Sequence, residues 1–579
     1  MTVRARARAE TPVASLVQSP ARIRARGRAG LALAGVSILL TIVVAALGPS
    51  VMEPALPGRP GQPPWSLAAH PPGYLAVALT AAALLLGAAG LGLAMHAARH
   101  GWRIPPGLLL AAGLGAAALL TLLPPFGSSD HLSYAAYGRM LATGHNPYLS
   151  TPGALARLGD PVARAVEDWK NSPSVYGALA TGGQALASLI GGTSVRLTVF
   201  VMSLLNLAGF AGAGLLLHRL AAGDRGRQLR AALLWTANPL LLQVLVAGAH
   251  VDSQAIVFAV AAVAAFAVAL RRAATARGGW HAGWPAAAAG ALAGLGFAVK
   301  LSFALVLAGL AVACWLARPG AAAARDTGLG RSGVPGAGGA GGPWYRSATA
   351  ALAGGLAAGF AVVTAAALAI GGTTSIRSAL SAGSYVAIAT PWRWVRAAIS
   401  LATGESLADD IVKAVAALAV LALAWLLLRR LPGAARLEPV PAGATGWPGR
   451  AWPGRAGPAG RDAGADAAGL AARAVLAFAL AWLTAGPYIL PWYDAFAWAL
   501  LPLLPWSVID GLVLARTTAL AIGYLPARTV TMPAGTGWLV SVVRRGVTPA
   551  LLLAVAVVLL ATLRKQQVTK RAVAAGAGK

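Results

Sequence analysis

Long apolar runs recur along the chain and alternate with short polar or basic segments. Each run has roughly the 17–25 residues that an α-helix needs to cross the hydrocarbon core of a bilayer. Runs of this length predict an all-α polytopic membrane protein with about thirteen transmembrane helices. The predicted spans, good to a few residues at either end, are 31–47, 74–95, 107–123, 197–217, 231–249, 253–270, 284–299, 301–317, 347–370, 411–428, 470–486, 495–515 and 548–563.

The run 176–190 decides the predicted topology, because it can either cross the membrane or lie along its surface. If it lies on the surface, the basic loops that follow the later spans fall on one side of the membrane. The positive-inside rule places such loops in the cytoplasm, and we therefore favour the surface position. The C-terminal tail with Arg564 and Lys565 then falls outside, against the rule. Either 487–526 contains a further pass or re-entrant stretch, or the tail is an exception.

This topology divides the chain into membrane regions joined by two linkers rich in Gly, Pro, Ala and Arg, a composition typical of disorder. From the N-terminus, we expect a basic cytoplasmic tail at 1–30, a transmembrane region at 31–317 with a long outer loop at 124–196, a linker at 318–346, transmembrane helices and an outer loop at 347–428, a second linker at 429–469, the last transmembrane helices at 470–563 and a tail at 564–579.

Composition and charge narrow the class of protein further. Charged residues make up only 11% of the chain and hydrophobic residues 58%, whereas a soluble domain carries about 25% charged residues. A soluble enzyme, a fibrous protein and a disordered scaffold are therefore excluded. The net charge of +30 comes from basic residues in short loops, without a stacking motif, which argues against a nucleic-acid partner. The single cysteine, Cys314, excludes an intramolecular disulfide and a cysteine-based metal site.

Asp130 is the acid whose position is most informative. It follows the third predicted span by a few residues, in the segment SSDHLSYAAYGRMLATGHNPY. A carboxylate at this water–lipid boundary can act as a general base on an acceptor hydroxyl while a lipid-linked donor lies in the adjacent bilayer. The plainer alternative is a helix cap, because Ser128, Ser129 and Asp130 precede an apolar-periodic segment. Spacing alone favours the cap.

Further polar residues fall on the same predicted face of the membrane. His250 and Asp252 stand between two spans, where they either cap the next helix or contact a phosphate or sugar. Lys300 also lies between two spans, where it either snorkels to the headgroups or holds a phosphate. Asp494 follows a proline-broken segment, which is tolerated at membrane depth mainly where backbone lines a cavity. Taken together, these clusters favour one interfacial active site over independent caps.

Two classes of function fit a polytopic chain with this charge pattern: an enzyme that uses a lipid-phosphate sugar, and a transporter or flippase of lipid-linked sugars. The sequence has no Walker-type or dinucleotide motif, which fits a lipid-linked donor. A transporter would place ionisable residues near the membrane midplane, whereas Asp130, Asp252 and Asp494 are predicted at one boundary. Charge placement therefore favours the enzyme.

A family resemblance rests on five segments between about residues 100 and 510. In order they are SSDHLSYAAYGRMLATGHNPYLSTP, SPSVYGAL, NPLLLQVLVAGAHVDSQ, GFAVKLSF and PYILPWYDAFAWALLPLL. This order resembles the polyprenol-phosphate-mannose-dependent α-1,6-mannosyltransferases of actinobacteria, members of the glycosyltransferase C superfamily that build the mannan core of lipomannan and lipoarabinomannan. The resemblance implies an inverting transfer of mannose from a polyprenyl-phosphate-mannose donor to a mannan or lipoglycan acceptor, on the outer face of the plasma membrane.

The resemblance also implies roles for particular residues. Asp130 takes the place of the catalytic base, and the run 176–190 that of a juxtamembrane helix in the outer loop. We expect Arg139 and Lys300 to hold the phosphate, and a divalent cation could share that work, although the sequence requires no cofactor. The substrate-binding residues expected from the matching segments are His131, Tyr134, Arg139, Asn146, Tyr148, Tyr176, His250, Asp252, Lys300, Trp492, Tyr493 and Asp494.

The chain departs from the family pattern at two positions. Ala178 follows Tyr176 and Gly177, where such enzymes often have a proline. His131 follows Asp130, where a second acid is frequent elsewhere in the superfamily. Both departures concern the outer loop, so they bear on the acceptor and the sugar.

Overall fold

The computed structural model describes residues 19–274, 279–317, 343–382, 385–431, 458–528, 532–533 and 535–576. Within these ranges the regular structure is helical, as the apolar pattern predicts. The long helices are α1 (Pro20–Leu47), α2 (Gly73–Arg99), α3 (Pro106–Thr121), α8 (Val195–Leu220), α11 (Asp252–Ala273), α12 (Gly279–Val299), α13 (Ala304–Leu316), α15 (Pro343–Ala382), α17 (Glu405–Arg430), α18 (Pro458–Ala485), α20 (Val508–Gly523) and α21 (Thr548–Gly576).

Ten helical segments in the described part of the chain are long and apolar enough to cross a membrane. The expected count of thirteen is therefore not confirmed. Two of the predicted spans form shorter apolar helices, at Pro106–Thr121 and Leu301–Leu316. A third, 495–515, is not one helix. The predicted span 231–249 is a composite of α9 (Arg225–Ala231), the π-helix η1 (Ala232–Thr236), α10 (Pro239–Leu241) and a second π-helix, η2 (Leu242–Ala247).

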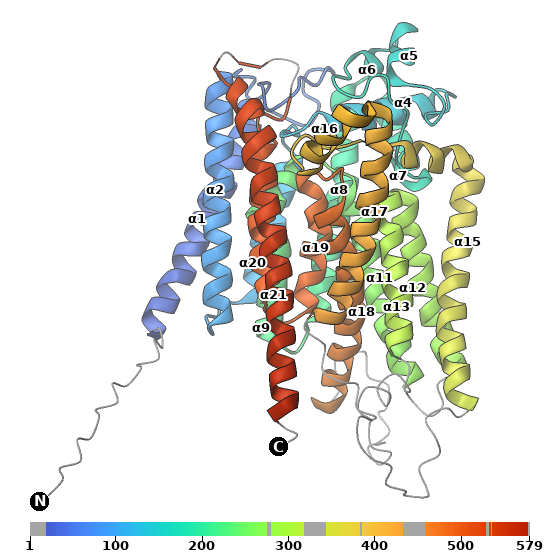
Figure 1. The fold of residues 1–579 in the computed structure, drawn as a ribbon. Coiled ribbons are helices and arrows are strands. Elements are labelled where there is room, and N and C mark those ends of the chain that lie inside the picture. The colour runs from blue at the N-terminus through green and yellow to red at the C-terminus, as the bar shows by residue number, and fades with distance from the viewer. Residues whose placement is uncertain are drawn as a thin grey trace, which may run out of the picture.

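The helices form a bundle with two distinct ends (Figure 1). At one end, which we call the capped end, lie α4 (Asp130–Ala142), α5 (Pro152–Arg157), α6 (Pro161–Arg164), α7 (Ala178–Gly191) and α16 (Trp392–Thr403). At the opposite end, which we call the open end, α1 begins and α21 ends. The juxtamembrane helices expected in the outer loop 124–196 are thus present as α4–α7.

Helices α4 and α7 cross at a glycine. A Cβ atom on Gly138 of α4 would lie 2.2 Å from the backbone oxygen of Gln184 on α7, which is closer than real Cβ contacts allow. The run 176–190 therefore forms a helix of 14 residues that packs on α4 at the capped end (Figure 1). A helix of this length is shorter than a typical membrane span, in agreement with the predicted surface position.

The predicted span 495–515 is corrected by the structure. The chain passes through α19 (Ala495–Leu500) and the short 3₁₀ helix η5 (Leu501–Leu503), then breaks before Ser507, which caps α20 in a capping box with Asp510. Pro502 and Pro505 fall at this break, because proline removes a helical N–H donor and clashes with the preceding turn. Helix α20 then leads the chain back toward the capped end, as expected if 487–526 contains a further pass. The C-terminal end of α21 consequently lies at the open end, with the start of α1 (Figure 1).

The predicted N-terminal tail and the two linkers fall largely outside the described residues, whereas 564–576 of the predicted C-terminal tail belong to α21. Of the expected basic tail 1–30, the part from Pro20 onward is helical and belongs to α1. Of the two expected linkers, 343–346 begin α15 and 458–469 belong to α18. The remainder of both linkers, 318–342 and 432–457, lies outside the description.

Two buried ion pairs fix α20 inside the bundle. Asp510 accepts a hydrogen bond from Arg230 of α9 at 2.6 Å, and Arg230 also lies over the Trp506 ring. Arg516 pairs with Asp494 of the 3₁₀ helix η4 (Pro491–Asp494). Charges at such depth are tolerated when they are paired and hydrogen-bonded. Asp494 also accepts a hydrogen bond from Thr517 at 2.8 Å.

Candidate active site

The Asp130 carboxylate faces other side chains and does not cap its helix. It is the first residue of α4, whose N-cap, Ser129, makes no side-chain capping hydrogen bond. Its Oδ2 atom lies 3.5 Å from the hydroxyl of Tyr134 and 3.8 Å from Nδ1 of His250. The side chain is 13% exposed. The geometry thus favours a chemical role over the cap that spacing alone favoured.

A second carboxylate lies close to Asp130, although it does not follow it in sequence. Asp168, from the segment between α6 and α7, accepts a hydrogen bond from the Ser129 hydroxyl, and its backbone oxygen accepts one from Ser133. The preceding residue, Glu167, forms an ion pair with Arg528. The sequence placed Asp168 in the outer loop, but no spacing signal connected it to Asp130.

Burial and the neighbouring charges set the protonation of Asp130. Desolvation by burial, followed by the negative charge of Asp168, raises the pKa of Asp130 to about 6, while Lys300 and a hydrogen bond from the Trp169 side chain oppose the rise. Burial lowers the pKa of His250, so this imidazole stays neutral at physiological pH. Asp130 is therefore ionised above about pH 6 and can accept a proton there.

Aromatic side chains form the wall around this carboxylate. Tyr176 donates a hydrogen bond to the Tyr134 hydroxyl at 3.2 Å. The His250 ring stacks on Trp492 with centroids 3.5 Å apart, and Tyr524 meets Trp492 edge-on at 5.3 Å. Tyr134, Tyr176, His250 and Trp492, all predicted from sequence, are thus brought together. Tyr524 was not predicted, because it lies outside the five matching segments.

Lys300 lies on the buried side of the site. Its ammonium group donates a hydrogen bond to Asp252 at 2.7 Å and lies 3.7 Å above the ring of Tyr493. Asp252 begins α11, and its second carboxylate oxygen is buried without a hydrogen-bond partner. The positive charge of Lys300 is also close enough to Asp130 to lower the pKa of its carboxylate. These three predicted residues therefore join the Asp130 site.

Arg139 and Asp494 do not join it. Arg139 pairs with Asp160 at 2.7 Å and so ties α4 to α6, because Asp160 also caps α6. Asp494 is fully buried and paired with Arg516, as described above. The expectation that Arg139 holds the phosphate thus lacks support from its position, and Asp494 has a structural partner.

Asn146 and Tyr148 make their contacts elsewhere, and His131, next to Asp130 in α4, makes no hydrogen bond to the site within the described residues. Asn146 accepts a hydrogen bond from the backbone N–H of Tyr148 and so closes a turn after α4. Tyr148 donates to Thr181 of α7 at 3.0 Å. His131 is fully buried, and neither ring nitrogen has a hydrogen-bond partner. Asn146 and Tyr148 thus have local structural contacts in place of a position in the site.

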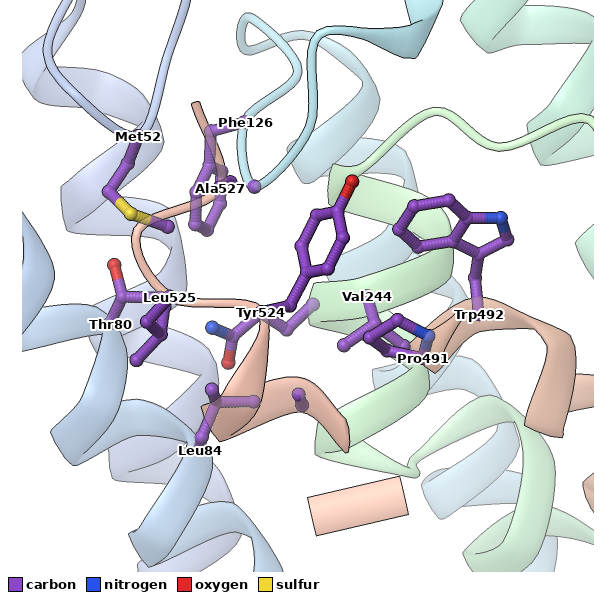
Figure 2. Close-up of a pocket in the computed structure, with 13 residues that line it drawn as sticks. Met52, Thr80, Leu84, Phe126, Val244, Pro491, Trp492, Tyr524, Leu525 and Ala527 are labelled. Atoms are coloured by element: carbon purple, nitrogen blue, oxygen red, sulfur yellow. The ribbon is translucent and has the colours of Figure 1, made fainter. Parts of the chain in front are cut away.

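A small pocket adjoins the aromatic wall (Figure 2). Trp492 and Tyr524 belong to both the wall and the pocket, and Figure 2 shows Tyr524 between Trp492 and the side chain of Phe126. Most of the other lining side chains are apolar: Met52, Leu84, Phe126, Val244, Pro491, Leu525 and Ala527. Gln243 also lines it, and its side-chain oxygen is buried without a hydrogen-bond partner. In the described part of the chain, no group of three or more His, Cys, Asp or Glu residues is placed to hold a metal ion.

The fold and the site define a polytopic helical membrane protein with a buried acid under a helical cap at one end of the bundle. Residues 32–317 match the family model described as "Alpha-(1->6)-mannopyranosyltransferase, N-terminal domain". This region, which contains Asp130, His250, Asp252 and Lys300, is therefore similar to that family. The resemblance found in the sequence segments is confirmed.

Curated relatives carry the same name. The chain is 29% identical over 134 residues to alpha-(1->6)-mannopyranosyltransferase A of Corynebacterium glutamicum, which covers 23% of this chain and 27% of the relative. It is 32% identical over 135 residues to alpha-(1->6)-mannopyranosyltransferase B of the same organism, covering 23% of this chain and 22% of the relative. A Mycobacterium tuberculosis relative of the same description is 33% identical over 133 residues, with 23% and 22% covered. The matches thus span about a quarter of each relative's length. No solved structure matches the chain significantly.

Proposed function

We propose that this protein is an integral-membrane inverting mannosyltransferase. It moves mannose from polyprenyl-phosphate-mannose to a mannan or lipoglycan acceptor and forms α-1,6 linkages on the outer face of the plasma membrane. The observation that carries the proposal is the Asp130 carboxylate, which is mostly buried, has a pKa raised to about 6 and contacts side chains of the aromatic wall. The family match and the names of the relatives support the sugar and the linkage.

The proposed reaction is a single displacement at the anomeric carbon. Asp130 accepts the proton of the acceptor hydroxyl, and the freed electron pair of that oxygen forms the new glycosidic bond. The bond between the anomeric carbon and the phosphate oxygen breaks, and its electron pair leaves on the polyprenyl phosphate. A base whose pKa lies near the operating pH combines a useful ionised fraction with sufficient basicity. The phosphate is a stable leaving anion and needs no strong general acid.

The donor phosphate is assigned to the Lys300 side of the site. An ammonium group binds phosphate as a point charge, and Asp252 and Tyr493 hold this one in a fixed position. The apolar pocket of Figure 2 lies beside Trp492 and offers contacts to the carrier lipid. A divalent cation at the donor phosphate would add to the charge of Lys300.

A transporter or flippase of lipid-linked sugars is the alternative function. Its strongest support is the presence of the ion pairs Arg230–Asp510 and Arg516–Asp494 inside the bundle, since ionisable groups at membrane depth often mark transport pathways. Arg230 donates a hydrogen bond to Asp510, and Asp494 accepts one from Thr517. None of the four charged residues lines the pocket of Figure 2. This placement favours a structural role for both pairs.

A transfer assay separates the two functions. Purified protein in lipid vesicles is incubated with labelled polyprenyl-phosphate-mannose and a short α-mannoside acceptor, and GDP-mannose is tested as donor in parallel. The enzyme proposal predicts a labelled, lengthened acceptor with the lipid donor and none with the nucleotide donor. Movement of labelled lipid across the bilayer without a lengthened acceptor would instead establish the flippase.

A further inference from the structure

Trp169 lies directly beside the Asp130 carboxylate and takes a strained backbone conformation. Its φ angle is +63°, a left-handed value that is unusual for a bulky side chain. Such strain persists only where the surroundings determine the conformation, and it is concentrated at functional sites. Here the two preceding residues hold the backbone in place: Glu167 forms an ion pair with Arg528, and Asp168 accepts a hydrogen bond from Ser129.

The Trp169 ring is partly open to solvent although it touches the site. It is 38% exposed, and its side chain is close enough to Asp130 to lower the pKa of that carboxylate. Tyr385, which follows α15, packs against it with ring centroids 5.7 Å apart and is 44% exposed. Tyr488 continues the row at 6.1 Å from Tyr385. The three rings thus form a strip in which Trp169 and Tyr385 are exposed and Tyr488 is more buried.

The two sides of Asp130 differ in the chemistry that they offer. On one side lie the buried His250 and Trp492 and the buried ammonium of Lys300, which suit a charged group that arrives from the bilayer. On the other side lie the exposed aromatic faces of Trp169 and Tyr385. A glycan is hydrophilic and arrives from water, yet each pyranose ring has an apolar face of C–H groups that packs on aromatic rings.

We propose that Trp169 and Tyr385 form an acceptor subsite, in which their exposed ring faces bind the sugar units next to the hydroxyl that Asp130 deprotonates. The proposal rests on the transferase function and names the half of the site that takes the acceptor. Because the strip extends beyond a single ring, it binds oligosaccharides better than monosaccharides.

Binding of an α-1,6-mannotetraose to the full-length protein tests the subsite without any transfer reaction. Trp169→Ala and Tyr385→Ala are each compared with wild type and with Trp65→Ala. This control removes another exposed tryptophan of the capped end, whose indole N–H donates to the backbone oxygen of Gly61. We expect about tenfold weaker binding in the first two variants and wild-type binding in Trp65→Ala. Equal binding in all four proteins would overturn the subsite.

Kinetics then separates the ring of Trp169 from its hydrogen bond. In Trp169→Ala the acceptor KM should rise about tenfold, while the donor KM stays at the wild-type value. In Trp169→Phe the ring remains but the indole N–H is lost. That hydrogen bond lowers the pKa of Asp130 among the charges of Asp168, Lys300 and Asp252. The acid limb of the pH profile should therefore move to higher pH while the acceptor KM is retained.

The outcomes distinguish failure of the subsite from failure of the transferase function. Oligosaccharide binding that depends on Trp169, with no transfer in wild type, supports a glycan site and overturns the transferase. Transfer in wild type with an unchanged acceptor KM in both Trp169→Ala and Tyr385→Ala overturns the subsite alone. A rise in the donor KM in place of the acceptor KM would place the donor on the strip and contradict the assignment of the two sides.

Discussion

At the residue scale, the site depends on contacts that no local spacing reveals. The sequence predicts Asp130, His250 and Lys300 individually, but each also has a structural explanation as a cap or a snorkelling side chain, and for Asp130 spacing alone favours the cap. The structure distinguishes between these explanations. Asp130 is the first residue of α4 and its carboxylate faces other side chains, and the Lys300 ammonium lies over the Tyr493 ring. Arg139 and Asp494 resembled them in sequence and have structural partners instead.

The charge of Asp168 gives a prediction for the pH dependence. Because this charge raises the pKa of Asp130, Asp168→Asn should lower that pKa and move the acid limb of kcat/KM to lower pH. In wild type, activity should fall as the pH drops through about 6, where Asp130 takes up a proton. Ser129→Ala is the control, since it removes the hydrogen bond to Asp168 and keeps the charge. A limb that stays in place or moves upward in Asp168→Asn would contradict the proposed electrostatics.

Lys300 and Arg139, the two basic residues expected at the phosphate, should differ in their effect on the donor KM. Lys300→Gln removes the ammonium charge but keeps a donor for Asp252, and the donor KM should rise about tenfold to a hundredfold, as expected for a lost charged hydrogen bond. Arg139→Gln should leave the donor KM unchanged and lower the free energy of unfolding by about 1.5–3 kcal/mol, because it breaks the partly buried pair with Asp160. Steady-state kinetics with varied donor measures both. A donor KM that responds to Arg139 and not to Lys300 would reverse the assignment.

At the element scale, the contact between α4 and α7 positions the catalytic helix. Gly138→Ala should force the two helices apart, because the new methyl group would meet the Gln184 backbone. Overpacking of this kind costs about 1–3 kcal/mol, and the displaced α4 carries Asp130 and Tyr134, so kcat should fall as well. Gly182→Ala on α7 is the matched control, since its methyl group would enter open space. Thermal unfolding in detergent and transfer rates measure the two effects, and equal behaviour of both variants would exclude a tight helix crossing.

The elements differ in how far the sequence predicts them. Long uniform runs such as those of α2 and α8 are predicted within a few residues, because hydrophobicity over a bilayer length is a strong signal. Helix α1 begins eleven residues before its predicted span, because its basic first turns carry no apolar signal. The run 495–515 failed because its apolar character continues through Pro502 and Pro505, so hydropathy conceals the break. Hydropathy identifies Arg225–Ala247 as one apolar segment, but it does not reveal that this segment is divided into π-helices and short α-helices.

At the scale of the whole molecule, α20 determines at which end of the bundle α21 finishes. It returns the chain to the capped end, so that α21 runs toward the open end, where α1 begins (Figure 1). If the capped end faces outward, Arg564 and Lys565 lie in the cytoplasm, in agreement with the positive-inside rule. The conflict that the sequence left open then disappears.

Reporter fusions at the C-terminus test this topology. A fused green fluorescent protein should be fluorescent, and a fused alkaline phosphatase should be inactive, because phosphatase folds only after export. The same phosphatase inserted at Gly159, in the turn between α5 and α6, should be active and serves as the control for the capped end. An active phosphatase at the C-terminus would contradict the placement of the two ends.

The central claim is that Asp130 is the general base of a lipid-linked sugar transfer, and one comparison tests it most directly. Asp130→Asn keeps the shape of the side chain and removes the base, while Asp160→Asn changes another carboxylate of the same outer loop that pairs with Arg139. Mannose transfer from polyprenyl-phosphate-mannose is measured at equal protein levels. The account predicts a loss of about a hundredfold to ten-thousandfold for Asp130→Asn and near wild-type transfer for Asp160→Asn. Transfer by Asp130→Asn at the wild-type rate would show that another group accepts the proton.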